Sequence, residues 1–364
     1  MSGTDGSAVR LTLIGPMPPP VHGQAVVMSR LVTELRPRFP LMRIADTHGG
    51  HSPGWASGIA AIRESMDSLR AIRSSDAVYI AVKAGKGMWL TTAAAGLARI
   101  AGAQVLLHHH SYAYIRERKL RMVALTRFAG PRAYHLVLSR SMASDLCSVM
   151  PEVQRTLVIG NAVFVDQALL DIPLRAGSAE LVLGHLSNLG MDKGLDQVVN
   201  LAVGLHKLGL PVKLIIGGPA SGDESRQQLD RAADALGDRF EYRGLLNGES
   251  KSHFFEDITH FIFPSRYVHE AVPLVLYEAM ASGAMCVTTR QGAIPEQLEG
   301  SPALLASSAE KFVEEALPTL ASAAVSTETS RECRQAYLRA LADSERQLSD
   351  MVAIIAAVPR LGRS

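Results

Sequence analysis

The chain has 364 residues, of which 47% are apolar and 20% charged, and its formal net charge is +2. This length predicts two domains, each able to bury its own core, and the composition excludes a disordered chain, a collagen and a coiled coil. The three cysteines are too few and too scattered for a disulfide framework or a zinc site, which is typical of a reducing cytosol. Because no run reads as a membrane span or a secretory signal, we expect a cytoplasmic protein.

Short β-branched runs alternate with helical stretches along most of the chain. Strands are predicted at residues 10–15, 76–82, 103–109, 134–139 and 155–160, and again at 180–186, 212–218, 240–244, 260–264 and 285–289. Amphipathic stretches such as 23–37 and 194–209 lie between them, so the pattern predicts βαβ units and parallel sheets. Periodicity is lost around 161–179, which predicts a linker between two doubly wound α/β domains at residues 1–165 and 175–340. The tail from Ser330 to Val358 is helical, and we expect about 345–364 to pack back on the first domain.

Charge is distributed unevenly along the chain. Residues 1–170 carry 19 lysines and arginines against ten acidic residues, whereas the remainder carries 18 against 25. A basic half predicts an anionic partner. The basic residues are densest at Arg116, Arg118, Lys119, Arg121, Arg127 and Arg132. This stretch is either a solvated helix face or a surface for a phosphate-bearing acceptor or an anionic membrane; no nucleic-acid motif accompanies it.

Two segments of the first domain carry polar residues at strand ends. The stretch PMPPPVHGQAVV joins the first strand to the first helix, and Gly23 would let a ligand approach the backbone at the helix start. It is not a dinucleotide fingerprint, because G-x-G-x-x-G is absent. Further on, His108, His109 and His110 end a strand. Adjacent strand residues point to alternate faces, so all three should not share one metal ion; each is either a satisfied polar group or a site residue.

The second domain begins with GHLSNLGMDKGLDQVV, in which Lys193 stands at a predicted helix start. A lysine there is either solvated or placed to meet a diphosphate. Gly217 and Gly218 end the next strand, and Arg243 and Gly244 end the one after it.

The segment FPSRYVHEAVPLVLYEAMASGAMCVTT is the most informative in the chain. Pro273 and Gly283 predict a helix at about 273–282 that is apolar nearly all round and therefore buried, with Glu278 in its middle. A buried carboxylate needs a partner, which is either an arginine or helix N-terminus or the two hydroxyls of a ribose. Glu270 lies just before the helix, beside backbone N–H groups that form a site for phosphate or sugar oxygens. One carboxylate for each sugar of a sugar nucleotide fits this spacing.

The run E-A-V-P-L-V-L-Y-E resembles the E-x7-E motif of retaining glycosyltransferases of family 4, and the following AMASGAMCVTTRQGAIPE resembles that family's continuation. The resemblance implies the GT-B fold, with two Rossmann-like domains facing a cleft. It implies that Glu278 binds the nucleotide ribose and Glu270 the donor sugar. Backbone contacts to the donor would come from Ala271, Val272, Pro273, Leu274 and Val275.

The same resemblance gives roles to other positions. Lys193 would bind the donor phosphates, with His185 where many members have arginine, and Ser187-Asn188 matches a family variant. Gly217, Arg243 and Gly244 would lie at the nucleotide, Gly23, His22 and Gln24 would form an acceptor and phosphate loop, and Asn161 would form a structural turn. His110 would lie near the transferred sugar, with His108 as the second choice.

The function implied is transfer of a sugar from a nucleotide-diphosphate sugar to a glycan, lipid-linked or small-molecule acceptor, with retention of anomeric configuration. His110, Glu270 and Lys193 would carry the chemistry, Lys193 doing what a metal does elsewhere. No Asp-x-Asp triplet is present, so we expect no metal and no cofactor. Two alternatives are a sugar-nucleotide epimerase on the same fold and a non-catalytic sugar-nucleotide-binding module. With a lipid-linked acceptor, Arg116, Arg118, Lys119 and Arg121 would meet an anionic membrane from the cytoplasmic side, and since no apolar anchor is evident, salt should screen the contact.

Overall fold

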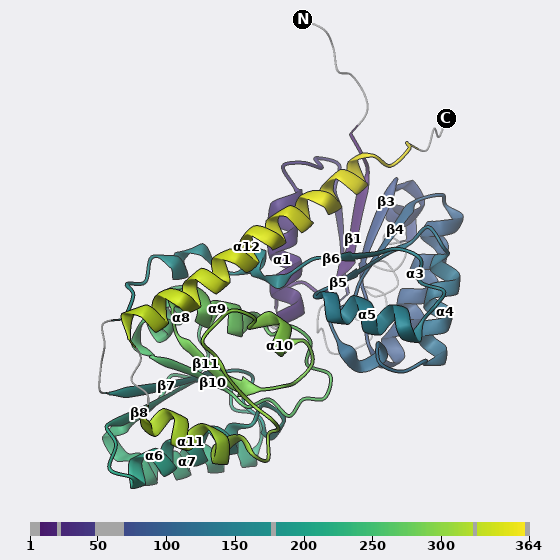
Figure 1. Ribbon diagram of the computed structural model, residues 1–364. Coiled ribbons are helices and arrows are strands. Elements are labelled where there is room, and N and C mark those ends of the chain that lie inside the picture. The colour runs from purple at the N-terminus through teal and green to yellow at the C-terminus, as the bar shows by residue number, and fades with distance from the viewer. Residues whose placement is uncertain (1–7, 20–22, 48–68, 176–179, 323–325, 361–364) are drawn as a thin grey trace, which may run out of the picture. The chain divides into compact units, whose positions relative to one another are not determined.

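The computed structural model describes the chain except for residues 1–7, 20–22, 48–68, 176–179, 323–325 and 361–364 (Figure 1). It consists of two compact units: unit 1 comprises Met1–Phe164 and Asp343–Ser364, and unit 2 comprises Val165–Ala342. Each unit is built on a parallel six-stranded sheet with helices around it, which confirms the expected α/β class.

Unit 1 has the strand order β2-β1-β3-β4-β5-β6. Its strands are β1 (Leu11–Gly15), β2 (Arg43–Asp46), β3 (Ala77–Ala81), β4 (Gln104–His108), β5 (Tyr134–Val137) and β6 (Thr156–Val158). Its helices are α1 (Gly23–Leu35), α3 (Met88–Ile100), α4 (Leu120–Ala129) and α5 (Arg140–Val149), with 3₁₀ turns at Gly85–Gly87, Tyr112–Tyr114 and Asn161–Phe164.

Unit 2 has the strand order β12-β11-β10-β7-β8-β9. Its strands are β7 (Leu181–Leu186), β8 (Val212–Gly217), β9 (Phe240–Tyr242), β10 (His260–Phe263), β11 (Met285–Thr289) and β12 (Leu304–Ala306). Its helices are α6 (Leu195–Lys207), α7 (Asp223–Leu236), α8 (Gly248–Asp257), α9 (Leu274–Ser282), α10 (Ile294–Gln297) and α11 (Phe312–Ser322), with 3₁₀ turns at Gln167–Leu170, Met191–Lys193 and Gly237–Arg239. When the six strands are numbered within the unit, this is the Rossmann order 3-2-1-4-5-6, read from β9 to β12. Sheets of this kind bind ligands at the switch point of the strand order, which here lies between β7 and β10.

All ten predicted strands are present, and two short ones were not predicted. β2 is only four residues long, and it begins and ends on the exposed charged residues Arg43 and Asp46. β12 has three residues, of which only Ala306 is fully buried. Neither strand is long enough to show an apolar period, and each forms only because a neighbouring strand offers it hydrogen bonds, β1 in one case and β11 in the other.

The buried side of α6 explains why this segment of unit 2 folds as it does. Its apolar residues recur at helical spacing, with Leu195, Val198, Val199, Ala202 and Leu205 all fully buried. They pack with residues of α7 and α11 against β7 and β8 on one face of the sheet (Figure 1). α8 and α9 lie on the opposite face, so α9 is covered by the sheet on one side and by neighbouring helices on another.

The last helix, α12 (Thr327–Ala356), begins in unit 2 and ends in unit 1. Near its end, Gln347 accepts a hydrogen bond from the backbone N–H of Gly160 at 2.8 Å, which ties the helix to the loop after β6. Within the described part of the chain, no helix combines the length and the hydrophobicity that a bilayer-spanning segment needs.

Candidate functional site

The switch point of unit 2 brings Lys193 and Glu270 together. Lys193 ends the 3₁₀ turn after β7, and Glu270 lies in the loop after β10. Gly194 has φ +75°, and a Cβ there would lie 2.2 Å from the carbonyl oxygen of Pro264, so only glycine lets the two loops approach this closely. The adjacent central strands β7 and β10 therefore place both predicted residues at the carboxyl end of the sheet.

Lys193 and Glu270 form an ion pair. Lys193 Nζ lies 2.7 Å from Glu270 Oε2, and Ser265 Oγ donates to the same oxygen at 2.9 Å. The side chains are 21% and 12% exposed, which leaves the pair partly accessible to a ligand. The ammonium also lies 4.7 Å from the centre of the Tyr267 ring. The Glu270 carboxylate thus holds the Lys193 ammonium at the switch point. A phosphate oxygen placed there could replace the carboxylate oxygen as the partner of this ammonium.

Helix α9 begins one residue later than predicted. Pro273 is its N-cap rather than its first residue and provides no side-chain acceptor, so no cap covers the first backbone N–H groups. Ala271 and Val272 are buried, with Leu274 and Val275 partly exposed. Gly292, at φ +57°, lies against this loop: a Cβ there would be 1.9 Å from the Glu270 carbonyl oxygen. The turn at 291–293 thus fixes the backbone of the predicted donor loop.

Glu278 is 5% exposed, as expected for the middle of a buried helix. Its partner is Lys251 of α8, whose Nζ lies 2.5 Å from Glu278 Oε1. The structural partner is therefore a lysine, whereas the sequence predicted an arginine or a helix N-terminus in that role. Among the residues that the structure describes, none donates a hydrogen bond to Glu278 Oε2.

His185 does not present a free ring nitrogen to a phosphate. The ring is fully buried in β7; Nδ1 lies 2.8 Å from the carbonyl oxygen of Ile262 and Nε2 lies 2.8 Å from Ser187 Oγ. Burial lowers the pKa of His185 to about 4, so the ring is neutral, and its proton must be on Nδ1 to bond a carbonyl. Ser187 Oγ then donates to Nε2, so both ring nitrogens of His185 are bonded within unit 2.

The other predicted nucleotide contacts differ in accessibility. Asn188 is exposed. A Cβ on Gly217 would lie 2.5 Å from Leu246 Cδ1, so a side chain at this position would meet a leucine. Arg243 N donates to Ile216 O at 2.9 Å and Gly244 O accepts from Gly218 N at 2.6 Å.

In unit 1, α1 starts at Gly23 as predicted. Apart from its chain neighbours, no described residue has an atom within 4 Å of a Cβ built on Gly23. Gln24 Nε2 is buried with no hydrogen-bond partner in the structure as described. His22 falls outside the described residues.

The three histidines point to two sides, as predicted. Tyr79 OH and His108 Nδ1 are 2.5 Å apart and the rings of His108 and His110 lie 4.0 Å apart, whereas His109 Nε2 lies 3.0 Å from His135 Nδ1. Burial lowers the pKa of His110 to about 3, so its ring is neutral, and Nε2 has no partner in the described structure. Nowhere in the described residues do three or more His, Cys, Asp or Glu side chains gather as metal ligands would.

Acidic side chains pair with most of the basic residues at 116–121, and exposed apolar side chains lie on the helices nearby. Arg116 pairs with Asp145, Arg118 with Glu152, and Lys119 with Glu117, whereas Arg121 has no ion pair within the described structure. Exposed apolar side chains lie on the neighbouring helices α3 and α4: Leu90 is 71% exposed, Ile100 85%, Leu120 75% and Phe128 58%. The amino-acid sequence did not indicate these exposed apolar side chains.

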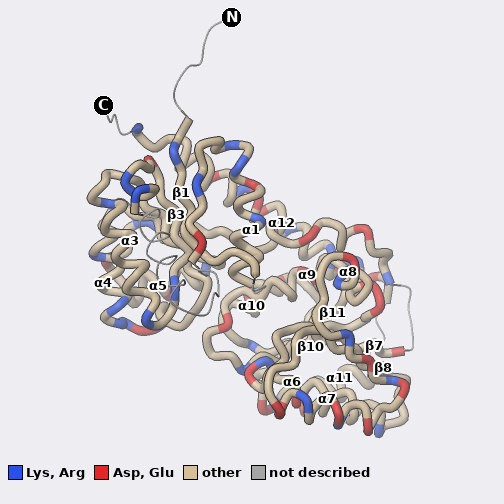
Figure 2. The backbone as a smooth tube through the Cα atoms, turned by 180° about the vertical axis from the view of Figure 1, so that it is seen from behind, with Lys and Arg blue, Asp and Glu red and all other residues tan. Residues whose placement is uncertain are grey.

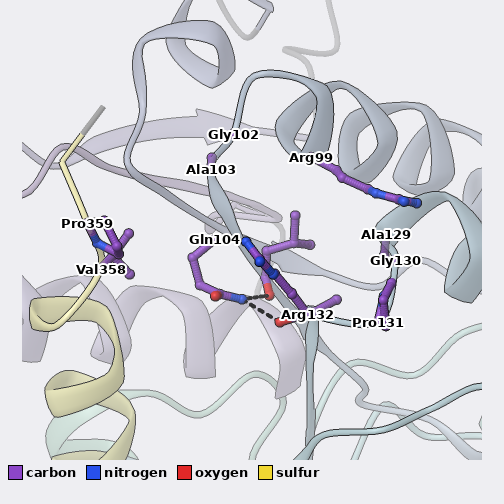
Figure 3. A pocket seen from close by; sticks show the side chains of 12 residues that line it. Arg99, Gly102, Ala103, Gln104, Ala129, Gly130, Pro131, Arg132, Val358 and Pro359 are labelled. Atoms are coloured by element: carbon purple, nitrogen blue, oxygen red, sulfur yellow. Dashed lines mark hydrogen bonds between the residues drawn. The ribbon is translucent and has the colours of Figure 1, made fainter. Parts of the chain in front are cut away.

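A cavity of about 610 Å³ opens elsewhere in unit 1 (Figure 3). It lies at the amino ends of strands β4 and β5, whereas His110 follows the carboxyl end of β4. Its lining includes Arg99, Arg132 and Pro359. Gln104 Nε2 donates to the carbonyls of Val105 and Arg132 inside it. None of the predicted site residues lines this cavity.

One family of known proteins matches the segment of unit 2 that contains Lys193, Glu270 and Glu278. Residues 180–322, all in unit 2, match the family model described as glycosyl transferases group 1. No curated protein sequence matches the chain.

Solved structures match along nearly the whole chain. Anabaena Alr3699/HepE in complex with UDP and glucose is 14% identical, with 95% of this chain and 100% of that one covered at a TM-score of 0.67. Sucrose-phosphate synthase from Thermosynechococcus elongatus is 14% identical, covering 94% and 97% at 0.64. The lipopolysaccharide outer core galactosyltransferase WaaB is 15% identical, covering 94% and 99% at 0.64. This likeness shows that the chain has the GT-B fold.

Proposed function

We propose that the protein is a retaining glycosyltransferase that moves a sugar from a nucleotide-diphosphate sugar to an acceptor. The observation that carries this proposal is the arrangement at the β7–β10 switch point, where Lys193, Glu270 and the uncapped start of α9 lie together, with Glu278 on the same helix. The family match over the same residues and the UDP-sugar complexes among the similar structures support it.

The roles follow from charge and position. Glu278 accepts the ribose hydroxyls and Glu270 a hydroxyl of the donor sugar. Lys193 and the backbone N–H groups at the start of α9 stabilise the negative charge that develops on the leaving diphosphate, which is the largest electrostatic demand of this reaction. The diphosphate itself takes the acceptor proton, so no protein nucleophile takes part. Neutral His110 would serve as a hydrogen-bonding group near the sugar rather than as a charged acid.

The decisive test measures donor binding and transfer separately. Thermal unfolding should be followed with UDP-, GDP-, ADP- and TDP-sugars, since a ligand at 100 times its dissociation constant stabilises by about 2.7 kcal/mol. The stabilising donor is then incubated with candidate acceptors, and the anomeric configuration of the product is determined by NMR. An isomerised donor without acceptor would indicate the epimerase, and an inverted product would refute the retaining assignment.

We also propose that the acceptor is lipid-linked and that unit 1 contacts an anionic membrane through α3 and α4. Neither helix contains an acidic residue, and together they carry Arg99, Arg121 and Arg127 (Figure 2). The helices pack together at Gly96, where a Cβ would lie 3.1 Å from the Phe128 ring. Apolar side chains flanked by arginines are typical of a surface that lies in the membrane interface.

Vesicle sedimentation tests this surface. The protein should pellet with anionic vesicles at low salt, and a fraction should stay bound as salt rises, because apolar burial is not screened. Replacing Leu120 and Phe128 with serine should remove the salt-resistant fraction. A wild-type protein that ignores anionic vesicles at low ionic strength would point to a soluble acceptor.

A further inference from the structure

Lys251 is an unexpected partner in the nucleotide region. It lies on α8, 27 residues before Glu278, and neither spacing nor motif connects the two. Its side chain is 30% exposed, whereas that of Glu278 is 6% exposed. The carboxylate is thus nearly cut off from water, but the ammonium that bonds it still reaches the surface.

The pair leaves one carboxylate oxygen available. Lys251 bonds Oε1, and no residue in the described part of the chain donates to Oε2. An ionised carboxylate accepts about four hydrogen bonds, and a ribose offers two vicinal hydroxyl donors. The lysine therefore holds one oxygen in place and offsets the charge of the buried group, while acceptor capacity remains for a diol.

A second carboxylate in the same unit has the same arrangement. Glu270 is bonded by Lys193 through one oxygen, Oε2, just as Glu278 is bonded by Lys251 through Oε1. Each carboxylate expected to meet a sugar thus has its own lysine, and the two lysines come from different loops and helices.

We propose that Lys251 is a positioning residue that orients Glu278 for the ribose, and so sets the discrimination between ribose and 2′-deoxyribose. This inference rests on the proposed function, because it needs a nucleotide at Glu278. Lys251 acts through the carboxylate and takes no part in the transfer itself.

Binding of UDP and of 2′-deoxy-UDP is measured by calorimetry for the wild type, Lys251→Met and Lys251→Arg; if UDP does not bind, ADP or GDP and its 2′-deoxy form replace it. The wild type should prefer the ribonucleotide by about tenfold or more, as expected for a hydrogen bond to a charged group. Lys251→Met should bind the ribonucleotide about tenfold more weakly and lose most of the preference, and Lys251→Arg should retain part of it.

The control is Lys213→Met. Lys213 is 34% exposed, similar to Lys251, and pairs with Glu241 at 2.9 Å, so its loss tests the effect of breaking any such ion pair. It should leave both affinities at the wild-type level.

If Lys251→Met weakens the binding of both nucleotides equally and keeps the preference for ribose, the lysine is merely structural and the inference is overturned. Failure of every nucleoside diphosphate to bind the wild type would instead overturn the proposed function, and the inference with it. Thermal melts report whether each variant is folded, and Lys251→Arg provides the comparison if Lys251→Met is not.

Discussion

Arg175 should be among the most sensitive positions for the stability of unit 2. Its guanidinium is 9% exposed and donates to three main-chain carbonyls, those of Phe255, Ile258 and Ser282. These carbonyls lie at the ends of α8 and α9, where a helix leaves its last acceptors unpaired and where a positive charge is favourable. Replacement by methionine keeps the aliphatic stem and removes every donor.

The size of the effect depends on how many carbonyls the variant leaves without a donor. A buried carbonyl in that state costs about 1–3 kcal/mol. Arg334 also reaches the Ser282 carbonyl, at 3.3 Å, so that acceptor retains a partner and two carbonyls are left bare. We therefore expect Arg175→Met to lower the free energy of unfolding by about 2–6 kcal/mol, a large fraction of the roughly 5–15 kcal/mol that stabilises a typical domain.

Urea unfolding followed by circular dichroism measures this change. Arg239→Met is the matched control, because Arg239 is 46% exposed and pairs with Glu180 at the surface. Such a pair is worth about 0–1 kcal/mol, so the control should unfold close to the wild-type midpoint. The reasoning is refuted if Arg175→Met unfolds within about 1 kcal/mol of the wild type, since that is less than one unsatisfied carbonyl should cost.

Three further predictions concern the proposed reaction. Glu278→Gln should weaken nucleoside diphosphate binding by about tenfold, as loss of a charged hydrogen bond implies, whereas Glu270→Gln should mainly lower turnover; full-strength binding by the Glu278 variant in calorimetry would contradict the ribose assignment. Turnover should persist in EDTA, and complete loss that magnesium or manganese restores would show that a metal is required. His110→Ala should lower the transfer rate more than about tenfold while nucleotide binding stays intact. Because burial lowers the pKa of His110 to about 3, the wild-type rate should show no titration of this histidine between about pH 6 and 8; near-normal rates for the variant would move the role elsewhere.

The strands were predictable because their signal is local. Segments such as Leu181–Leu186 and Val212–Gly217 are buried on both faces of a parallel sheet, and this burial appears directly as an apolar run. The helix around Glu278 was predictable for the same reason, apart from one residue at its start, where Pro273 caps the helix rather than entering it.

The partners of the site residues were not predictable in this way. Lys193 and Glu270 are 77 residues apart, and Lys251 and Glu278 come from different helices, so each ion pair depends on how the sheet brings its loops together. The role of His185 depended on the carbonyl of Ile262, a backbone atom of the adjacent strand that no residue pattern indicates. The apolar surface on α3 and α4 was missed because an exposed leucine and a buried one look alike in a sequence.

The buried histidines should make the stability of the protein fall at acidic pH. Burial lowers the pKa values of His135, His185 and His260 to about 4, below the ordinary value near 6.5 that they regain when the chain unfolds. The unfolded chain therefore binds more protons than the folded one between about pH 6.5 and 4, so stability is complete above this window and is lost as the pH falls through it. At pH 5 each ring costs about 2 kcal/mol by this relation. His185 and His260 both lie in unit 2, so this unit should lose about 4 kcal/mol of stability at that pH. The free energy of unfolding, measured in urea, should therefore fall as the pH is lowered from about 6.5 to 4.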